Sequence, residues 1–352
     1  MGGINSSYMD IKGKYIYGII NSRLGKEGVG GLPTEISTIS YQDISAVVSE
    51  SEPVNLASMS KNALARLLLK HQRVIEEVMP EHTIIPMRLG TLASSESEAT
   101  EILNRGYCLI KDIFEKIEDK IEIDLVATWN DFTSVLKEVG EEQEIQKFKE
   151  TLLTNSEGIT TQEQMKVGMM VKDALDRKRE RCSREIQDYL ENCWESFKDH
   201  ERMNDQMVAN LAFLINRHKQ EDFDKRIDEL NNRFAERLNF RCIAPLPPYS
   251  FYTLEIKKMP SIEIDWARKK LGLLKDSVTK DEIEEAYLKS AMIFHPDKNS
   301  DAPEAEKAFD EATRAYKILL DYGEACKQGG LEGMSFGEGA EKKNEILVRV
   351  RE

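Results

Sequence analysis

The 352-residue sequence has no apolar run that approaches the roughly 18 residues needed to cross a membrane. Its N-terminus also lacks the basic segment followed by an apolar one that marks a secretory signal. We therefore expect a cytoplasmic protein without a membrane span.

Metal-binding and catalytic motifs are missing as well. The five cysteines form no CxxC pair, and the five histidines form no HxxxH pair, so we expect reduced thiols and no zinc site. The glycine-rich stretch at residues 25–31 has neither the GxGxxG pattern nor the lysine arrangement of a phosphate-binding loop. The sequence predicts no cofactor, no metal, no catalytic residue and a protein that is not an enzyme.

Positive charge is in deficit, with 49 Lys and Arg against 63 Asp and Glu and a formal net charge of −14. Such a surface repels phosphate backbones, so general nucleic-acid binding is not expected. The basic run at residues 177–181 is interpreted as a solvated helix face. Hydrophobic residues make up 40% and charged residues 32%, which is typical of globular domains with solvated helices.

Hydrophobic periodicity predicts an α+β domain over residues 14–118. His71 falls on the apolar face of a predicted helix, and we expect a buried histidine satisfied by a neighbour. A polar cluster of His71 with Glu76 and Arg88 is the alternative. The predicted elements in chain order are strands at 15–20, 36–41 and 44–49, a helix at 60–79, a strand at 82–89 and a helix from 95.

A second α+β domain is predicted over residues 119–258. Its order of strands and helices, with short connections, suits a ferredoxin-like sheet covered by helices. The predicted elements are a strand at 121–129, a long helix at 161–199, a strand at 206–216, a helix at 221–238 and an extended, proline-interrupted segment at 240–256.

A small all-α hairpin is predicted at residues 262–325. Pro296 disfavours helix at His295 and locks its own backbone, so His295 and Asp297 are presented on a stiff loop between two amphipathic helices. Residues 326–352 are expected to be a glycine-rich linker and a C-terminal tail. The final apolar segment, residues 346–352, either pairs as an edge strand or hangs free.

The hairpin resembles the J domain, the module that engages DnaK-type chaperones and stimulates their ATPase. The residues that carry this resemblance lie within 264–322 and are Trp266–Leu273, Glu282–Ala291, His295-Pro296-Asp297, Phe309, Ala315-Tyr316 and Leu319. The resemblance implies that His295, Pro296 and Asp297 bind the chaperone, with Lys289 and Lys298 as the nearest bases.

The helix before the loop departs from the family. It carries Glu282, Glu284 and Glu285, and it has Leu288 and Ile293 where the family often has a base. Weaker electrostatic steering toward an acidic chaperone surface follows from these residues.

Residues 14–257 resemble the GvpF/GvpL family of gas vesicle proteins. The segments that carry the resemblance are Tyr15–Ile19, Ile44–Ser49, His71–Glu76, Ile85–Thr91, Gly168–Ala174 and Ala244–Phe251. The resemblance implies a role in gas vesicle formation, through contact with the small hydrophobic shell protein and with other accessory proteins. Tyr249 and Phe251 are the candidate residues for contact with a partner.

The leading hypothesis is an assembly factor that is located in the cytoplasm in association with gas vesicles. It binds the hydrophobic shell protein, which must be kept from aggregating before it enters the wall, and recruits a DnaK-type chaperone. The alternatives are a general J-domain co-chaperone with another client, and a minor structural component of the gas vesicle.

Overall fold

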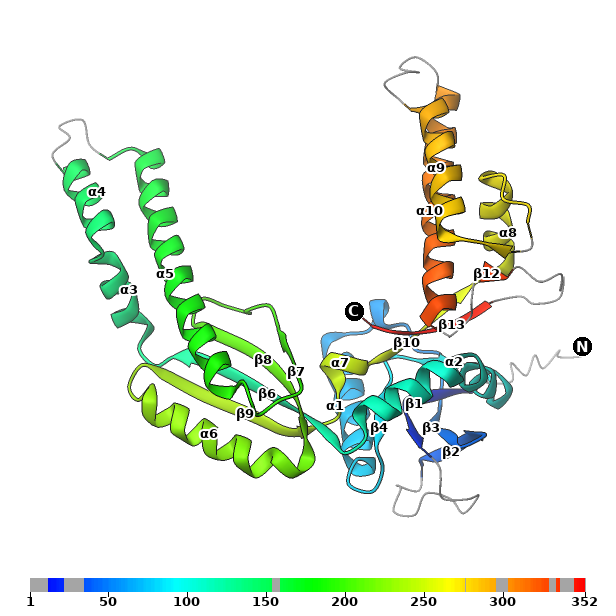
Figure 1. Cartoon of the computed structure of the whole chain (residues 1–352), viewed down its shortest axis with the longest axis horizontal. Helices are drawn as coiled ribbons and strands as arrows, with labels where there is room; N and C mark the ends of the chain where they lie inside the picture. The colour runs from blue at the N-terminus through cyan, green and yellow to red at the C-terminus, as the bar shows by residue number, and fades with distance from the viewer. Residues whose placement is uncertain are drawn as a thin grey trace, which may run out of the picture. The chain divides into compact units, whose positions relative to one another are not determined.

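The computed structural model describes residues 12–21, 35–153, 159–275, 277–295, 303–328, 334–335 and 345–351 (Figure 1). Its contacts separate the chain into two compact units. Unit 1 comprises Met1–Glu118 together with Tyr252–Glu352, and unit 2 comprises Asp119–Phe251. The first unit is therefore built from both ends of the chain.

The first part of unit 1 consists of an antiparallel sheet and two long helices. The strands are β1 (Gly13–Asn21), β2 (Ser37–Tyr41), β3 (Ile44–Ser51), β4 (Ile84–Pro86) and β5 (Leu92–Ala93). The sheet order is β2-β3-β1-β4, β5 also pairs with β1, and every pairing is antiparallel. The helices are η1 (Leu56–Ser58, a 3-10 turn), α1 (Lys61–Val78) and α2 (Glu96–Ile117).

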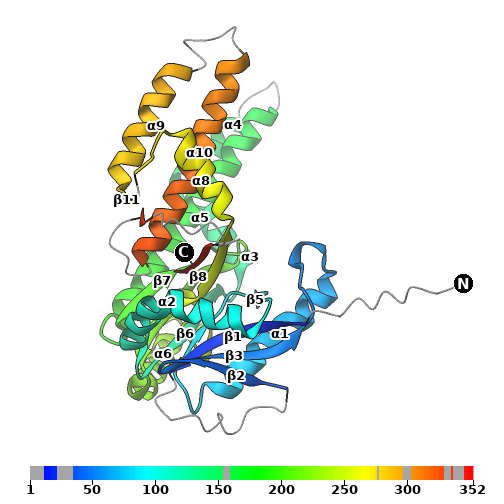
Figure 2. The ribbon, with the colours of Figure 1, turned by 90° about the vertical axis from the view of Figure 1, so that its right-hand side faces the viewer.

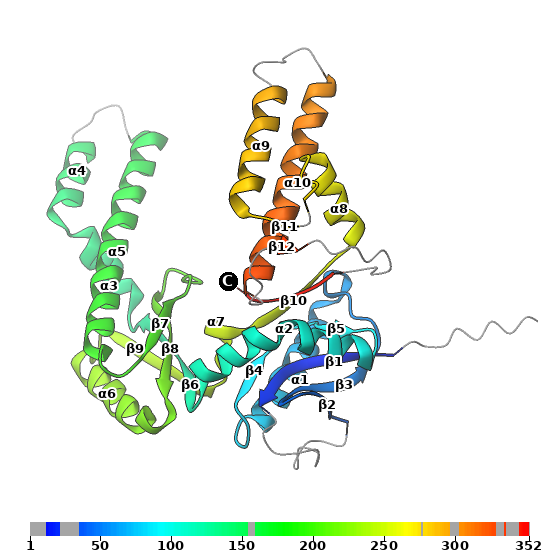
Figure 3. The same ribbon diagram turned by 45° about the vertical axis from the view of Figure 1, so that its right-hand side comes forward.

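The two helices cover opposite faces of this sheet, because alternate side chains of a strand point to opposite sides. Tyr15 of β1 reaches His71 of α1, whereas Ile16 packs in the cluster that contains the buried face of α2. Figure 3 shows α2 running beside the sheet that contains β1. Ser60 and Ser95 cap α1 and α2 by accepting hydrogen bonds from backbone N–H groups three residues on. The predicted α+β arrangement is confirmed.

The C-terminal segment pairs as a strand, which decides between the two alternatives left by the sequence. Strand β13 (Glu345–Val350) runs antiparallel to β10 (Leu254–Met259), with Leu254 opposite Val350. Val348 lies in the same hydrophobic cluster as the buried face of α2. Residues 252–258, which the sequence analysis assigned to the second domain, belong to unit 1.

Helices of the predicted hairpin, which Figure 2 shows together, lie between β10 and β13 in the chain order. They are α8 (Ser261–Lys270), α9 (Lys280–Phe294) and α10 (Pro303–Gln328), accompanied by the short paired strands β11 (Ser277–Val278) and β12 (Met334–Ser335). We call residues 261–328 the helical module. Residues 326–328, expected as linker, continue α10, because Cys326 is buried in the module core.

Unit 2 is a four-stranded antiparallel sheet with the order β7-β8-β6-β9. Its strands are β6 (Lys120–Trp129), β7 (Ser196–Asp199), β8 (Met207–Asn216) and β9 (Leu238–Leu246). The ferredoxin-like fold of this unit stays a prediction.

The helices of unit 2 are α3 (Phe132–Gly140), α4 (Gln143–Leu153), α5 (Thr161–Leu190), η2 (Arg217–Lys219), α6 (Gln220–Arg233) and α7 (Tyr249–Tyr252, at the boundary with unit 1). Helix α5 ends at Leu190, earlier than the predicted 199. Residues 196–199 instead form β7, because Phe197 packs edge-on against Trp194 at 4.8 Å and joins Phe213 of β8.

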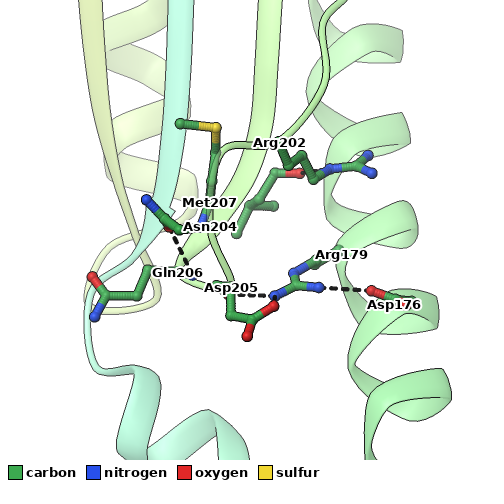
Figure 4. A network of polar contacts seen from close by, with 8 residues as sticks. Asp176, Arg179, Arg202, Asn204, Asp205, Gln206 and Met207 are labelled. Carbon is green, nitrogen blue, oxygen red and sulfur yellow. Dashed lines mark hydrogen bonds and ion pairs between the residues drawn. The ribbon is translucent and has the colours of Figure 1, made fainter. Parts of the chain in front are cut away.

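Arg179 is buried, so the interpretation of residues 177–181 as a solvated helix face is wrong at this position. The Arg179 residue is only 6% exposed, since it shares a face of α5 with buried Cys182 and Ile186. Its guanidinium donates to Asp176 at 2.6 Å and to the backbone and side chain of Asp205 in the β7–β8 connection (Figure 4). The two terminal nitrogens of the buried guanidinium are thus hydrogen-bonded, whereas its Nε has no hydrogen-bond partner among the described residues.

Within the described part of the chain, no helix combines the length and apolar character that a membrane crossing requires.

Candidate functional site

The helical module carries the first group of predicted site residues. His295 directly follows α9 as its C-cap residue, and its backbone leaves the helical region (φ −56°, ψ 131°), as expected for a residue before proline. Its ring packs against Phe309 of α10, with the centroids 5.8 Å apart. Pro296, Asp297 and Lys298 lie outside the described residues.

Aromatic stacking fixes α9 on α10. Tyr287 and Tyr316 stack with centroids 4.4 Å apart and planes inclined by 13°, and the Tyr287 hydroxyl lies 3.4 Å from Thr313 Oγ1. Ile283 is fully buried against the apolar face of α10. The two helices are therefore held in one register, with the His295 segment at the end of the pair.

The outward face of α9 is acidic near its N-terminus and apolar near its C-terminus. Leu288, Met292 and Ile293 are 54%, 64% and 63% exposed. Lys289, the predicted accessory base, lies 2.9 Å from Glu285 of its own helix. This ion pair is exposed, so it holds Lys289 only weakly.

A buried carboxylate fastens the module's two flanking strands to the first sheet. Glu255 of β10 is 7% exposed, and its two oxygens accept from Arg88 at 2.9 Å and from Arg349 of β13 at 2.6 Å. Arg88 follows β4, so the interaction joins three segments of the chain. The module core also continues into both strands through Met259 and Leu347.

The second group of predicted residues, Tyr249 and Phe251, lies on α7 at the end of unit 2. Ser250 between them donates from its backbone N–H and its hydroxyl to Glu122 of β6, at 2.8 and 2.7 Å. His200 Nε2 lies 2.9 Å from the same hydroxyl. Phe251 is 8% exposed and Tyr249 is half-buried, so Tyr249 offers more of the surface needed for contact.

Glu122 forms a carboxyl pair with Asp124, two residues along the same strand. Burial raises the pKa of both groups. Asp124 raises the pKa of Glu122 further, whereas the hydrogen bond with Glu122 lowers the pKa of Asp124 and partly offsets its shift. Sequence reasoning missed this pair, although acids at positions i and i+2 of a strand must lie on one face. The carboxylate here accepts from the serine and not from the histidine, so the arrangement lacks the order of a nucleophilic triad.

His71 has the buried role that the sequence predicts, although Glu76 and Arg88 are not its partners. Its Nδ1 lies 3.0 Å from the Tyr15 hydroxyl, which accepts from the Gly90 backbone N–H at 3.0 Å. Burial lowers the pKa of His71 to about 4. The described residues contain no group of three or more His, Cys, Asp or Glu side chains placed to hold a metal ion.

Two family models match this chain in successive regions. The model of the gas vesicle synthesis protein GvpL/GvpF matches residues 13–253, and the model of the DnaJ domain matches residues 269–324. The two predicted resemblances are confirmed, and the helical module contains the J domain of this chain.

Individual relatives agree with the family models. Gas vesicle protein F of Dolichospermum flosaquae is 23% identical over 254 residues, which cover 68% of this chain and 98% of that protein. The chaperone protein DnaJ of Oleidesulfovibrio alaskensis is 43% identical over 74 residues, a fifth of each chain.

Solved structures show the same fold over the first part of the chain. The crystal structure of gas vesicle protein GvpF from Anabaena sp. PCC7120 superposes with a TM-score of 0.59 at 21% identity, covering 69% of this chain and 98% of that one. The corresponding structure from Microcystis aeruginosa gives a TM-score of 0.57.

Proposed function

Because the chain belongs to the gas vesicle synthesis protein GvpL/GvpF family, we propose that it is an accessory protein of gas vesicle assembly that binds the hydrophobic shell protein. Its J domain recruits a DnaK-type chaperone to the bound subunit. The protein acts in the cytoplasm, on growing gas vesicles and with other accessory proteins, and catalyses no reaction of its own.

The observation that carries this proposal is the attachment of the J domain. It follows β10 and precedes β13, and both strands are fastened to the first sheet through Glu255. A chaperone that engages the His295-Pro296-Asp297 segment would therefore be attached to unit 1, which also contains the first sheet. Holding two partners on one scaffold raises the effective concentration of each for the other.

Chaperone recruitment is tested by the ATPase rate of a DnaK-type chaperone in the presence of the full chain. Asp297→Asn removes the charge and nearly preserves the side-chain shape. We expect the stimulation seen with the unchanged chain to be lost, whereas Asp301→Asn, a neighbouring acid outside the motif, should retain it. Equal stimulation by the Asp297 variant would remove the recruitment part of the proposal.

Shell-protein binding is tested separately, by capture of the purified shell protein on the full immobilised chain. We expect binding without ATP and in the presence of a chelator, and the Asp297→Asn variant should bind equally well. Absence of association under all these conditions would leave the alternative of a J-domain co-chaperone with another client.

A further inference from the structure

Helix α5 has an exposed apolar pair on the side that faces away from its packing partners. Met165 and Met169 are 67% and 65% exposed, one helical turn apart. Ala174 and Leu175 of the same helix are buried, and α5 packs against α3 and α4 (Figure 1). Methionine pairs exposed in this way are typical of surfaces that bind apolar partners.

A base continues the same face of α5. Lys172 lies one turn beyond Met169, is exposed, and forms no ion pair with any residue that the structure describes. Gly168 lies beside the stripe, and a Cβ built on it would meet nothing within 4 Å. Another helix could therefore approach α5 closely along this line.

Helix α9 offers the complementary face. Leu288 and Met292 are again one turn apart, point away from α10 and are 54% and 64% exposed. Glu284 and Glu285 lie one turn before Leu288 on the same side. Each has a lysine of its own helix nearby, but these pairs are exposed and cost little to rearrange.

The two faces match when the helices run antiparallel. Met165 then meets Met292, Met169 meets Leu288, and Lys172 meets Glu285, because seven residues separate the ends of both stripes. The next residue on the α5 face, Asp176, is already neutralised by Arg179 at 2.6 Å.

From this match we propose that the α5 stripe of one copy docks antiparallel on the α9 stripe of a second copy of this chain. The contact is head-to-tail, because each copy contributes a different surface, and it leaves one stripe free at each end of a dimer. This inference goes beyond the proposed function, and its test needs neither the shell protein nor a chaperone.

Self-association of the full chain is measured by sedimentation velocity over a range of concentrations. We expect a sedimentation coefficient that rises with concentration in the unchanged protein. The pair Met165→Ser with Met169→Ser, and separately the pair Leu288→Ser with Met292→Ser, should each raise the dissociation constant at least about tenfold. Met203→Ser and Ile262→Ser, which alter residues 83% and 77% exposed outside both stripes, are the matched controls.

Mixing the two double variants tests the head-to-tail geometry. Each retains the stripe that the other has lost, so the mixture should form a dimer that neither variant forms alone. Lys172→Glu should also weaken association, and adding Glu285→Lys should recover it. The proposal is wrong if the unchanged chain sediments independently of concentration, if the stripe variants associate like the controls, or if the mixture does not dimerise.

Discussion

Gly106 of α2 and Val348 of β13 are in such close contact that a Cβ built on Gly106 would lie 2.9 Å from Val348 Cγ1. A glycine in the middle of α2 therefore lets the C-terminal strand pack directly on the helix backbone. The pairing of β13 with β10 depends on this approach, because Val348 belongs to the core cluster of α2.

Replacing Gly106 with alanine should destabilise unit 1 by about 1–2 kcal/mol, since overpacking against Val348 exceeds the gain in helix propensity. Gly168→Ala is the matched control, because its Cβ would enter open space. The control should stabilise the protein by roughly 0.5–1 kcal/mol. Urea denaturation measures both, and shifts of the same sign would contradict the assigned contact.

Glu255→Gln should cost about 1–3 kcal/mol of stability, because Arg88 and Arg349 both lose their shared charged acceptor. Glu263→Gln is the control, since its ion pair with Arg314 is exposed and 3.8 Å long. Protection of the β13 amides from hydrogen exchange should fall in the first variant only. Unchanged protection there would show that the carboxylate does not hold the strand.

Acidification should destabilise the protein through His71. The pKa of His71 falls from 6.5 to about 4 on folding, so the unfolded chain binds more protons between these values. The free energy of unfolding is therefore highest above pH 6.5 and decreases toward pH 4. The decrease between pH 7 and pH 5 is on the order of 2 kcal/mol. His71→Gln should make the denaturation midpoint nearly independent of pH over this range. His218→Gln, at an exposed site, should leave the pH dependence unchanged.

Glu122 should give the opposite dependence. Burial raises its pKa, so the folded protein holds a proton that the unfolded chain releases above an ordinary carboxyl pKa of 4.5. Its stabilising contribution is present below that pH and is lost as the pH rises through the higher folded value. Glu122→Gln should make the denaturation midpoint less sensitive to pH between 4.5 and about 8, compared with Glu201→Gln at an exposed position. Parallel pH curves for the two variants would contradict the assignment.

Local patterns determined the elements of this protein. The stripe of α1, its serine cap, and the helices on either side of the His295 segment follow from residues within a few positions of one another. Family motifs with fixed spacing, such as His295-Pro296-Asp297, were recognisable for the same reason. Backbone geometry acts over one or two turns, and a single sequence records it directly.

Tertiary structure alone decided which distant segments meet. The apolar run at 346–350 indicates a strand, but only folding brings Val350 opposite Leu254 and places the J domain between paired strands. The burial of Arg179 and the Ser250–Glu122 contact also join segments that no local period relates. Such contacts depend on how several elements pack together, so their partners emerge only when the whole unit has folded.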